Sequence, residues 1–181
     1  MKLSIIWKLS EKESDNQVTF DCLKAELADY VDPIQILICP ANKEQLYHAQ
    51  FQLKNGTAAI CSPVGASEIE VFKDAQSKVD GDFVTYLYGG DRLSAHSLAQ
   101  LKVILQERSD NAIFMMRKIM PDETDGAFAK EILGKKIVNM NLKKDYGVYP
   151  FYFGGTILSA EAFRSRSFHG ELGIEAEREF F

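Results

Sequence analysis

The chain has 181 residues, of which 46% are hydrophobic and 26% are charged. This balance fits one globular domain and excludes a disordered chain. The formal net charge of −5 argues against a nucleic-acid partner, because proteins that bind nucleic acids usually carry a basic surplus. No apolar run approaches the roughly 20 residues that span a bilayer, so we expect no transmembrane segment. Cys39 and Cys61 end short apolar runs and no C-x-x-C pair is present, which indicates buried thiols of a reducing compartment and hence a cytoplasmic protein.

Buried strands alternate with amphipathic helices through the first half of the chain. The strands are expected over residues 3–7, 34–39, 57–61 and 83–88. The helices are expected over about 16–30, over a segment with Leu46, Ala49 and Leu53 on its inner face, over about 67–81, and over about 94–108. Ser67 followed by Glu70 is the capping-box pattern that starts the third of these helices. Near-continuous apolar strands that alternate with helices predict a mostly parallel sheet covered on both faces.

The second half of the chain is less regular. Further strands are expected within 112–118, 135–141 and 151–158, and Ser159 has the character of a helix N-cap. A last helix, over about 171–181, ends on Phe180 and Phe181. We expect these rings to fold back onto the sheet, beside a surface that forms a homodimer or is covered by a C-terminal continuation. Residues 1–181 are thus expected to be a single domain, excised from the N-terminal part of a longer protein.

The segment 81–94 carries the most information about function. A strand runs directly into Tyr88, Gly89, Gly90 and Asp91, and ligands of α/β proteins bind outside the carboxyl ends of parallel strands. Two glycines let the backbone approach a ligand closely. Asp91 then has two interpretations: a carboxylate that holds a divalent cation between phosphates, or a turn residue that helps to start the next helix.

Other candidate residues each have a structural alternative. The sequence contains no G-x-G-x-x-G, no G-x-x-x-x-G-K-[ST], no H-E-x-x-H and no nucleophile elbow. Glu177 fits either a general base or a solvated face of the last helix. Gly154 and Gly155 fit either a place where an acceptor approaches the backbone or a β-bulge.

The order of these parts resembles family 2 glycosyltransferases, which share the GT-A fold, over nearly the whole chain. The runs LSIIW and IQILIC resemble the family's first two strands. The helix with Lys73 and the strand from Gly81 to Leu87 resemble the stretch that the family writes a-x-G-E-Y-I-x-F-L-D-x-D-D. Residues 153–163 resemble its glycine-bearing segment, and 177–180 resemble its terminal Glu-Asp-x-x-Phe segment. The resemblance implies a GT-A-like three-layer α/β/α sandwich with a mostly parallel sheet, and we expect the strand order 3-2-1-4 in its first half.

In that family the fold transfers a sugar from a nucleotide-diphosphate donor to an acceptor, usually with Mg²⁺ or Mn²⁺. The resemblance therefore implies a nucleotide-sugar donor, a glycan or surface-polymer acceptor, and a Mg²⁺ or Mn²⁺ ion held by Asp91. It implies a general base at Glu177 and an acceptor side at Gly154 and Gly155. The donor-binding positions that it implies are Lys8, Ser10, Lys73, Tyr88, Gly89 and Gly90.

The sequence departs from the family at the positions that carry chemistry. Residues 40–43, Pro-Ala-Asn-Lys, stand where the family has Asp-Asp-Gly-Ser after its second strand. The Asp-x-Asp metal motif falls on Tyr88-Gly89-Gly90, which removes charge that would hold a divalent cation. The family's catalytic base falls on Arg178, which cannot accept a proton, although Glu177 matches its neighbour.

Two functions of different classes stay open from the sequence. One is a glycosyltransferase domain of a longer bacterial-type protein that builds a surface glycan. The other is a catalytically inactive module that binds a glycan or docks onto an active neighbour. A nucleotidyltransferase is a third, weaker interpretation, because no glycine-rich phosphate loop follows the first strand. We expect the ligand in a crevice between residues 8–13 and residues 88–91. Lys8 and Lys73 fit either a role in offsetting phosphate charge in place of a metal or simple exposure to solvent.

Overall fold

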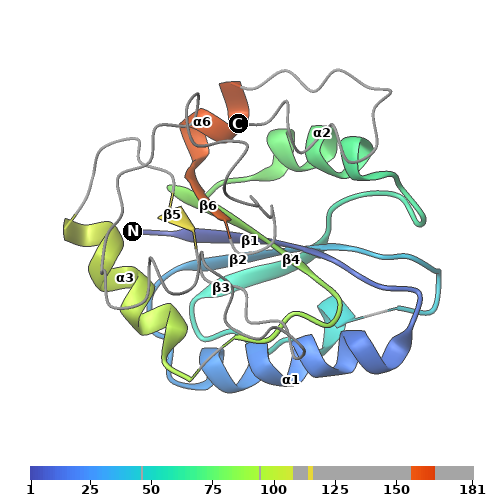
Figure 1. Ribbon diagram of the computed structural model, residues 1–181, viewed down its shortest axis with the longest axis horizontal. Coiled ribbons are helices and arrows are strands. Elements are labelled where there is room, and N and C mark those ends of the chain that lie inside the picture. Colours follow the sequence, from blue (N-terminus) through green and yellow to red (C-terminus); the bar gives the residue numbers. More distant parts are fainter. Residues whose placement is uncertain (46, 94, 108–113, 116–155, 166–181) are drawn as a thin grey trace, which may run out of the picture.

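A computed structural model describes residues 1–45, 47–93, 95–107, 114–115 and 156–165, and every structural statement below concerns these residues (Figure 1). Their elements are β1 (Leu3–Lys8), α1 (Glu13–Ala28), β2 (Ile34–Cys39), the 3₁₀ helix η1 (Tyr47–Gln50), β3 (Gly56–Ile60), α2 (Glu68–Lys78), β4 (Phe83–Tyr88), α3 (Ser97–Glu107), β5 (Phe114–Met115), β6 (Thr156–Ser159) and α6 (Ala160–Ser165). Among these helices, none is long and apolar enough to cross a membrane.

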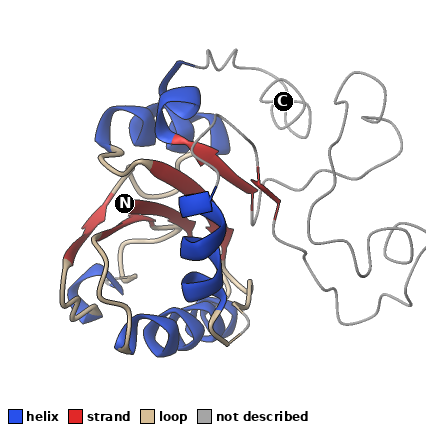
Figure 2. Cartoon of the chain, turned by 90° about the vertical axis from the view of Figure 1, so that its left-hand side faces the viewer, coloured by secondary structure: helices blue, strands red, loops and turns tan. Residues whose placement is uncertain are grey.

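The strands form one six-stranded sheet in the order β3-β2-β1-β4-β6-β5. The first four strands are parallel to one another, whereas β6 runs antiparallel to β4 and β5 antiparallel to β6. The predicted order 3-2-1-4 and the mostly parallel sheet are therefore confirmed. Figures 1 and 2 show helices on both sides of the sheet, as expected for a three-layer sandwich.

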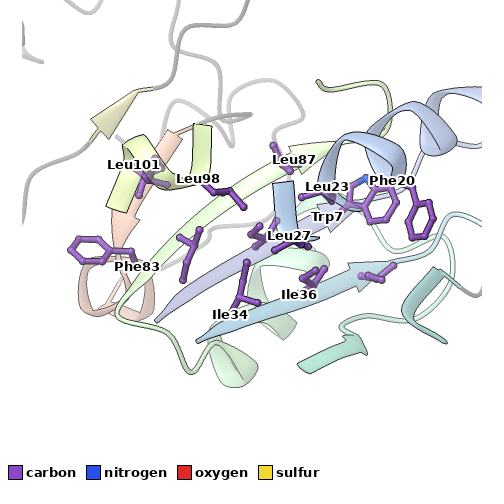
Figure 3. Close-up of a cluster of buried hydrophobic side chains, with 14 of the residues drawn as sticks. Trp7, Phe20, Leu23, Leu27, Ile34, Ile36, Phe83, Leu87, Leu98 and Leu101 are labelled. Atoms are coloured by element: carbon purple, nitrogen blue, oxygen red, sulfur yellow. The ribbon is translucent and has the colours of Figure 1, made fainter. Parts of the chain in front are cut away.

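Each face of the sheet has its own hydrophobic layer. Alternate residues of β1, β2 and β4 pack under α1 and α3, where Trp7 and Phe20 lie toward one end and Leu98 and Leu101 toward the other (Figure 3). The intervening residues of the same strands pack under α2 and α6, with Phe72 and Phe163 among them. Because successive strand residues point to opposite faces and both are buried, these strands read as continuous apolar runs in the sequence.

One predicted helix is wrong. The segment with Leu46, Ala49 and Leu53 forms only the 3₁₀ turn Tyr47–Gln50. Aromatic packing explains the difference: the Tyr47 ring lies 5.2 Å from Trp7, and the Phe51 ring lies 5.1 Å from Phe20, measured between centroids. Burying large rings against the sheet outweighs a weak local helix preference.

Two predicted helix starts are confirmed. Glu70 N–H donates to Ser67 Oγ while Ser67 N–H donates to the Glu70 carboxylate, which is the capping box that the sequence predicted. The Ala162 N–H donates to Ser159 Oγ at 3.1 Å, as expected of an N-cap. The strand predicted within 135–141 and the helix predicted over 171–181, with Phe180 and Phe181, lie outside the described residues.

Candidate functional site

A row of four side chains crosses the carboxyl ends of the parallel strands. Lys8 on β1 is the register partner of Cys39 on β2 and of Tyr88 on β4. Cys61 directly follows β3, and its N–H donates to the Ile38 carbonyl oxygen at 2.7 Å. Cys39 and Cys61 belong to the layer under α2, and Tyr88 packs against that layer. We call Cys61, Cys39, Lys8 and Tyr88 the carboxyl-end row.

A hollow of about 220 Å³ lies beside this row, at the ends of β1, β2 and β3. Its polar lining residues are Lys8, Glu11, Cys39 and Ser62. Ser62 is only 3% exposed, and its hydroxyl makes no hydrogen bond to oxygen or nitrogen within the described part of the chain. The hydroxyl oxygen is buried, and the nearby Cys39 sulfur is its partner, so Ser62 ties the end of β3 to the end of β2. Residues that complete the lining are Leu9, Pro40, Ala41, Gly65, Ala66 and Val71.

Two buried amide side chains hold the loops that border the hollow. Asn16 accepts a hydrogen bond from Ser10 N–H at 2.7 Å and donates to the Ser10 carbonyl at 2.8 Å. Gln45 also donates to the Ser10 carbonyl at 2.8 Å, and it accepts from Ala41 N–H at 2.8 Å. The loop after β1 is therefore bound both to α1 and to the loop after β2. These hydrogen bonds fix the positions of the two loops that border the hollow relative to each other.

The loop after β4 packs directly against the loop after β1. A Cβ atom added at Gly89 would lie 2.3 Å from Asn16 Oδ1 and 2.7 Å from Ser10 N. Gly90 has a φ of 100°, a region that favours glycine, and its N–H donates to Thr19 Oγ1 at 2.9 Å. These contacts fill the space between the two loops, where the sequence predicted the ligand crevice. The hollow lies instead beside the ends of β1, β2 and β3.

Asp91 closes the turn after β4. Its Oδ2 accepts a hydrogen bond from Tyr88 N–H at 2.8 Å, and its own N–H donates to the Tyr88 carbonyl at 3.1 Å. The described residues contain no group of three or more His, Cys, Asp or Glu that could hold a metal ion. Mg²⁺ and Mn²⁺ prefer several oxygen ligands, and neighbouring Tyr88 and Gly90 supply no carboxylate. These residues therefore fit a turn better than a divalent cation.

The remaining predicted site residues divide into two groups. Lys73 is exposed on α2. Hydrogen bonds from Ser67 are the main cause of the lowered pKa of Glu70, and the charge of Lys73 makes a smaller contribution in the same direction. Lys73 does not line the hollow. Glu177, Gly154 and Gly155 lie outside the described residues and stay predictions.

The two thiols of the row were not predicted from the sequence as part of a site. A hydrogen bond from the Cys61 thiol lowers the pKa of Cys39. Burial opposes this, whereas a hydrogen bond from Ser62 and the charges of Lys8 and Lys78 add to the lowering. The hydrogen bond between the two thiols and burial raise the pKa of Cys61. A signal was present: both cysteines end buried strands, and in a parallel sheet such ends lie along one edge.

No family model matches the chain, and neither does any curated protein. Solved structures do match. TarS residues 1–349 from S. aureus align with a TM-score of 0.67 at 12% identity, over 91% of this chain and 48% of that one. The same protein in complex with UDP-GlcNAc aligns with a TM-score of 0.61 at 13% identity, over 91% of this chain and 47% of that one.

A second glycosyltransferase is also similar. Glucosyl-3-phosphoglycerate synthase from Mycobacterium tuberculosis, in complex with Mn²⁺, UDP and glucosyl-3-phosphoglycerate, aligns with a TM-score of 0.53 at 12% identity, over 89% of this chain and 57% of that one. The chain thus has the fold of GT-A-type glycosyltransferases, and it spans about half the length of the structures that it matches.

Proposed function

We propose that this chain binds a nucleoside-diphosphate sugar, with the nucleotide in the hollow, as the donor-binding part of a glycosyltransferase. The observation that carries the proposal is the hollow at the carboxyl ends of β1, β2 and β3 in a GT-A-type sheet. Open α/β sheets bind ligands at this edge. A neighbour of the same fold has been solved with UDP-GlcNAc, which supports a uridine nucleotide as the first ligand to test.

Lys8 has the chemistry that a diphosphate needs. It ends β1 in the middle of the carboxyl-end row and lines the hollow. An ammonium group at this place offsets the negative charge of a bound diphosphate and of the leaving nucleotide after sugar transfer. Ser62 also lines the hollow. Ser10 contributes by holding the loop through its backbone bonds with Asn16.

The acceptor half of the reaction rests on the family resemblance. On that basis Glu177 takes the proton of an acceptor hydroxyl, and Gly154 and Gly155 border the acceptor, which we propose is a glycan or a surface polymer. We place such a glycosyltransferase in the cytoplasm, a reducing compartment in which the free thiols of Cys39 and Cys61 are the resting form.

One observation favours a second function, a nucleotide- or glycan-binding module without catalysis. The Asp91 carboxylate is bound to the backbone of its own turn, and the described residues form no metal site. The fold would then be kept for binding, or for docking onto an active neighbour.

Calorimetry with UDP, GDP, CDP and UDP-GlcNAc, each with and without Mn²⁺, tests the proposal. We expect binding of at least one uridine ligand to the unmodified chain. Lys8→Ala should weaken it about ten- to a hundredfold, because a hydrogen bond to a charged group contributes roughly 1.5–3 kcal/mol. Lys24→Ala is the matched control, since Lys24 lies on α1 over the ring of Phe20, on the opposite face of the sheet.

The outcomes separate the two functions. Binding together with sugar release from UDP-GlcNAc supports the enzyme, and binding without turnover supports the module. If no nucleotide binds, or if Lys8→Ala and Lys24→Ala behave alike, the hollow is not a donor site.

A further inference from the structure

Two cysteines lie side by side at the carboxyl ends of β2 and β3. Ile38 and Ile60 are register partners, and Cys39 and Cys61 follow them directly along the chain. Both cysteine side chains belong to the core layer under α2. Neighbouring strands lie about 4.7–4.9 Å apart, and disulfides join Cα atoms about 4.4–6.8 Å apart. The sheet therefore holds these residues at the spacing that a disulfide needs.

Cys39 faces the hollow although it is buried. Cys39 is 2% exposed and Cys61 is 0% exposed, and Cys39 forms part of the hollow's lining. A small oxidant that enters the hollow therefore meets Cys39 before Cys61. We propose that Cys39 and Cys61 are a redox-active dithiol, which closes reversibly into a disulfide when a peroxide reacts at the floor of the hollow.

The surroundings of Cys39 favour its reactive form. The thiolate, and not the thiol, is the nucleophile in such reactions. Hydrogen bonds from Cys61 and Ser62 and the positive charges of nearby lysines lower the pKa of Cys39, against the opposing effect of burial. Lys78 is held at this place because its Nζ donates to the carbonyl oxygen of Cys61.

The reaction balances with a peroxide as the oxidant. The Cys39 thiolate attacks one oxygen of hydrogen peroxide, the O–O bond breaks, and hydroxide leaves, so that Cys39 becomes a sulfenic acid. The Cys61 sulfur then gives up its proton and attacks the Cys39 sulfur. The S–O bond breaks, water leaves, and the disulfide forms. A dithiol reductant reverses the change by thiol–disulfide exchange.

The disulfide would control donor binding, and this part rests on the proposed function. A nucleotide in the hollow covers Cys39 and should slow its oxidation. The disulfide in turn draws Cys39 toward β3 and changes the wall that the ligand contacts, so it should weaken nucleotide binding. Transient disulfides of this kind serve redox sensing in reducing compartments.

Mass spectrometry of the full 181-residue chain tests the dithiol. The reduced protein is treated with equimolar hydrogen peroxide, alkylated with iodoacetamide and digested. We expect a cross-linked peptide that contains Cys39 and Cys61 and disappears with dithiothreitol, while Cys22 is alkylated. Cys22→Ser should form the same cross-link. Cys61→Ser should instead accumulate a sulfenic acid on Cys39, which dimedone traps, and circular dichroism confirms that this variant is folded.

Each outcome decides the inference. Alkylation of both Cys39 and Cys61 after peroxide treatment, or a cross-link that involves Cys22, overturns it. UDP affinity of the reduced and oxidised forms then tests the link to donor binding, and equal affinity overturns that link. If the cross-link forms and UDP binds neither form, the dithiol stands and the proposed function fails. If UDP binds and no cross-link forms, the proposed function stands and the dithiol inference fails.

Discussion

Replacing Asn16 with alanine should destabilise the protein and loosen the wall of the hollow. Asn16 is 0% exposed and makes two hydrogen bonds to the backbone of Ser10, at 2.7 and 2.8 Å. The substitution removes both bonds and leaves the Ser10 N–H without its acceptor. The bond to the Ser10 carbonyl contributes about 1 kcal/mol and the unsatisfied Ser10 N–H costs roughly 1–3 kcal/mol, so we expect a loss of about 2–4 kcal/mol in the free energy of unfolding.

Urea unfolding measures this loss, and Gln17→Ala is the matched control. Gln17 is the next residue of α1, and its amide donates only to Asp21 on the exposed side of the helix, at 2.8 Å. The control should stay within about 0.5 kcal/mol of the unmodified protein. Asn16→Ala should also weaken UDP binding, because the loop with Ser10 borders the hollow. If Asn16→Ala were as stable as Gln17→Ala, the role assigned to Asn16 in holding this loop would be wrong.

Two further predictions concern the loop after β4 and the start of α2. Gly89→Ala should cost about 1–3 kcal/mol, because its new methyl group would lie 2.3 Å from Asn16 Oδ1; thermal unfolding measures this, and an unchanged melting temperature would refute the close packing. At the start of α2, hydrogen bonds from Ser67 lower the pKa of Glu70 from its ordinary 4.5. A lowered folded-state pKa adds stability above the ordinary value, and this stability is lost as the pH falls through the folded-state pKa. The unmodified protein should therefore lose its advantage over Glu70→Gln below about pH 4.5 in urea unfolding, and a constant difference down to acid pH would contradict the capping box.

Local signals in the sequence predicted much of the fold. The four apolar runs became β1 to β4, and the Ser67–Glu70 pattern became a capping box. These features depend on neighbours along the chain, so they can be read from it. The strand order 3-2-1-4 came from the repeated strand–helix units together with the family resemblance, and the sheet confirms it.

The site was harder to predict, because it depends on register and on contacts between distant segments. Lys8 was identified, but its position between Cys39 and Tyr88 follows from the pairing of whole strands, which no local pattern specifies. The turn with Asp91 left two interpretations open, and the bond from Tyr88 N–H to its carboxylate, which favours the turn, became visible only in the structure. The helix predicted around Ala49 failed for a related reason, since rings from β1 and α1 decide that conformation.

The carboxyl-end row has a consequence for how a ligand acts on folding. Its residues, Lys8, Cys39, Cys61 and Tyr88, come from the ends of four different strands. The hollow beside this row is lined from the ends of β1, β2 and β3, so a ligand in it is bound only when those three strands are paired. Binding to the native state stabilises it by RT ln(1 + [L]/Kd), so a nucleotide should raise the opening free energy of amides in these three strands together. Hydrogen exchange with and without nucleotide would then trace β1, β2 and β3 as a single cooperative unit.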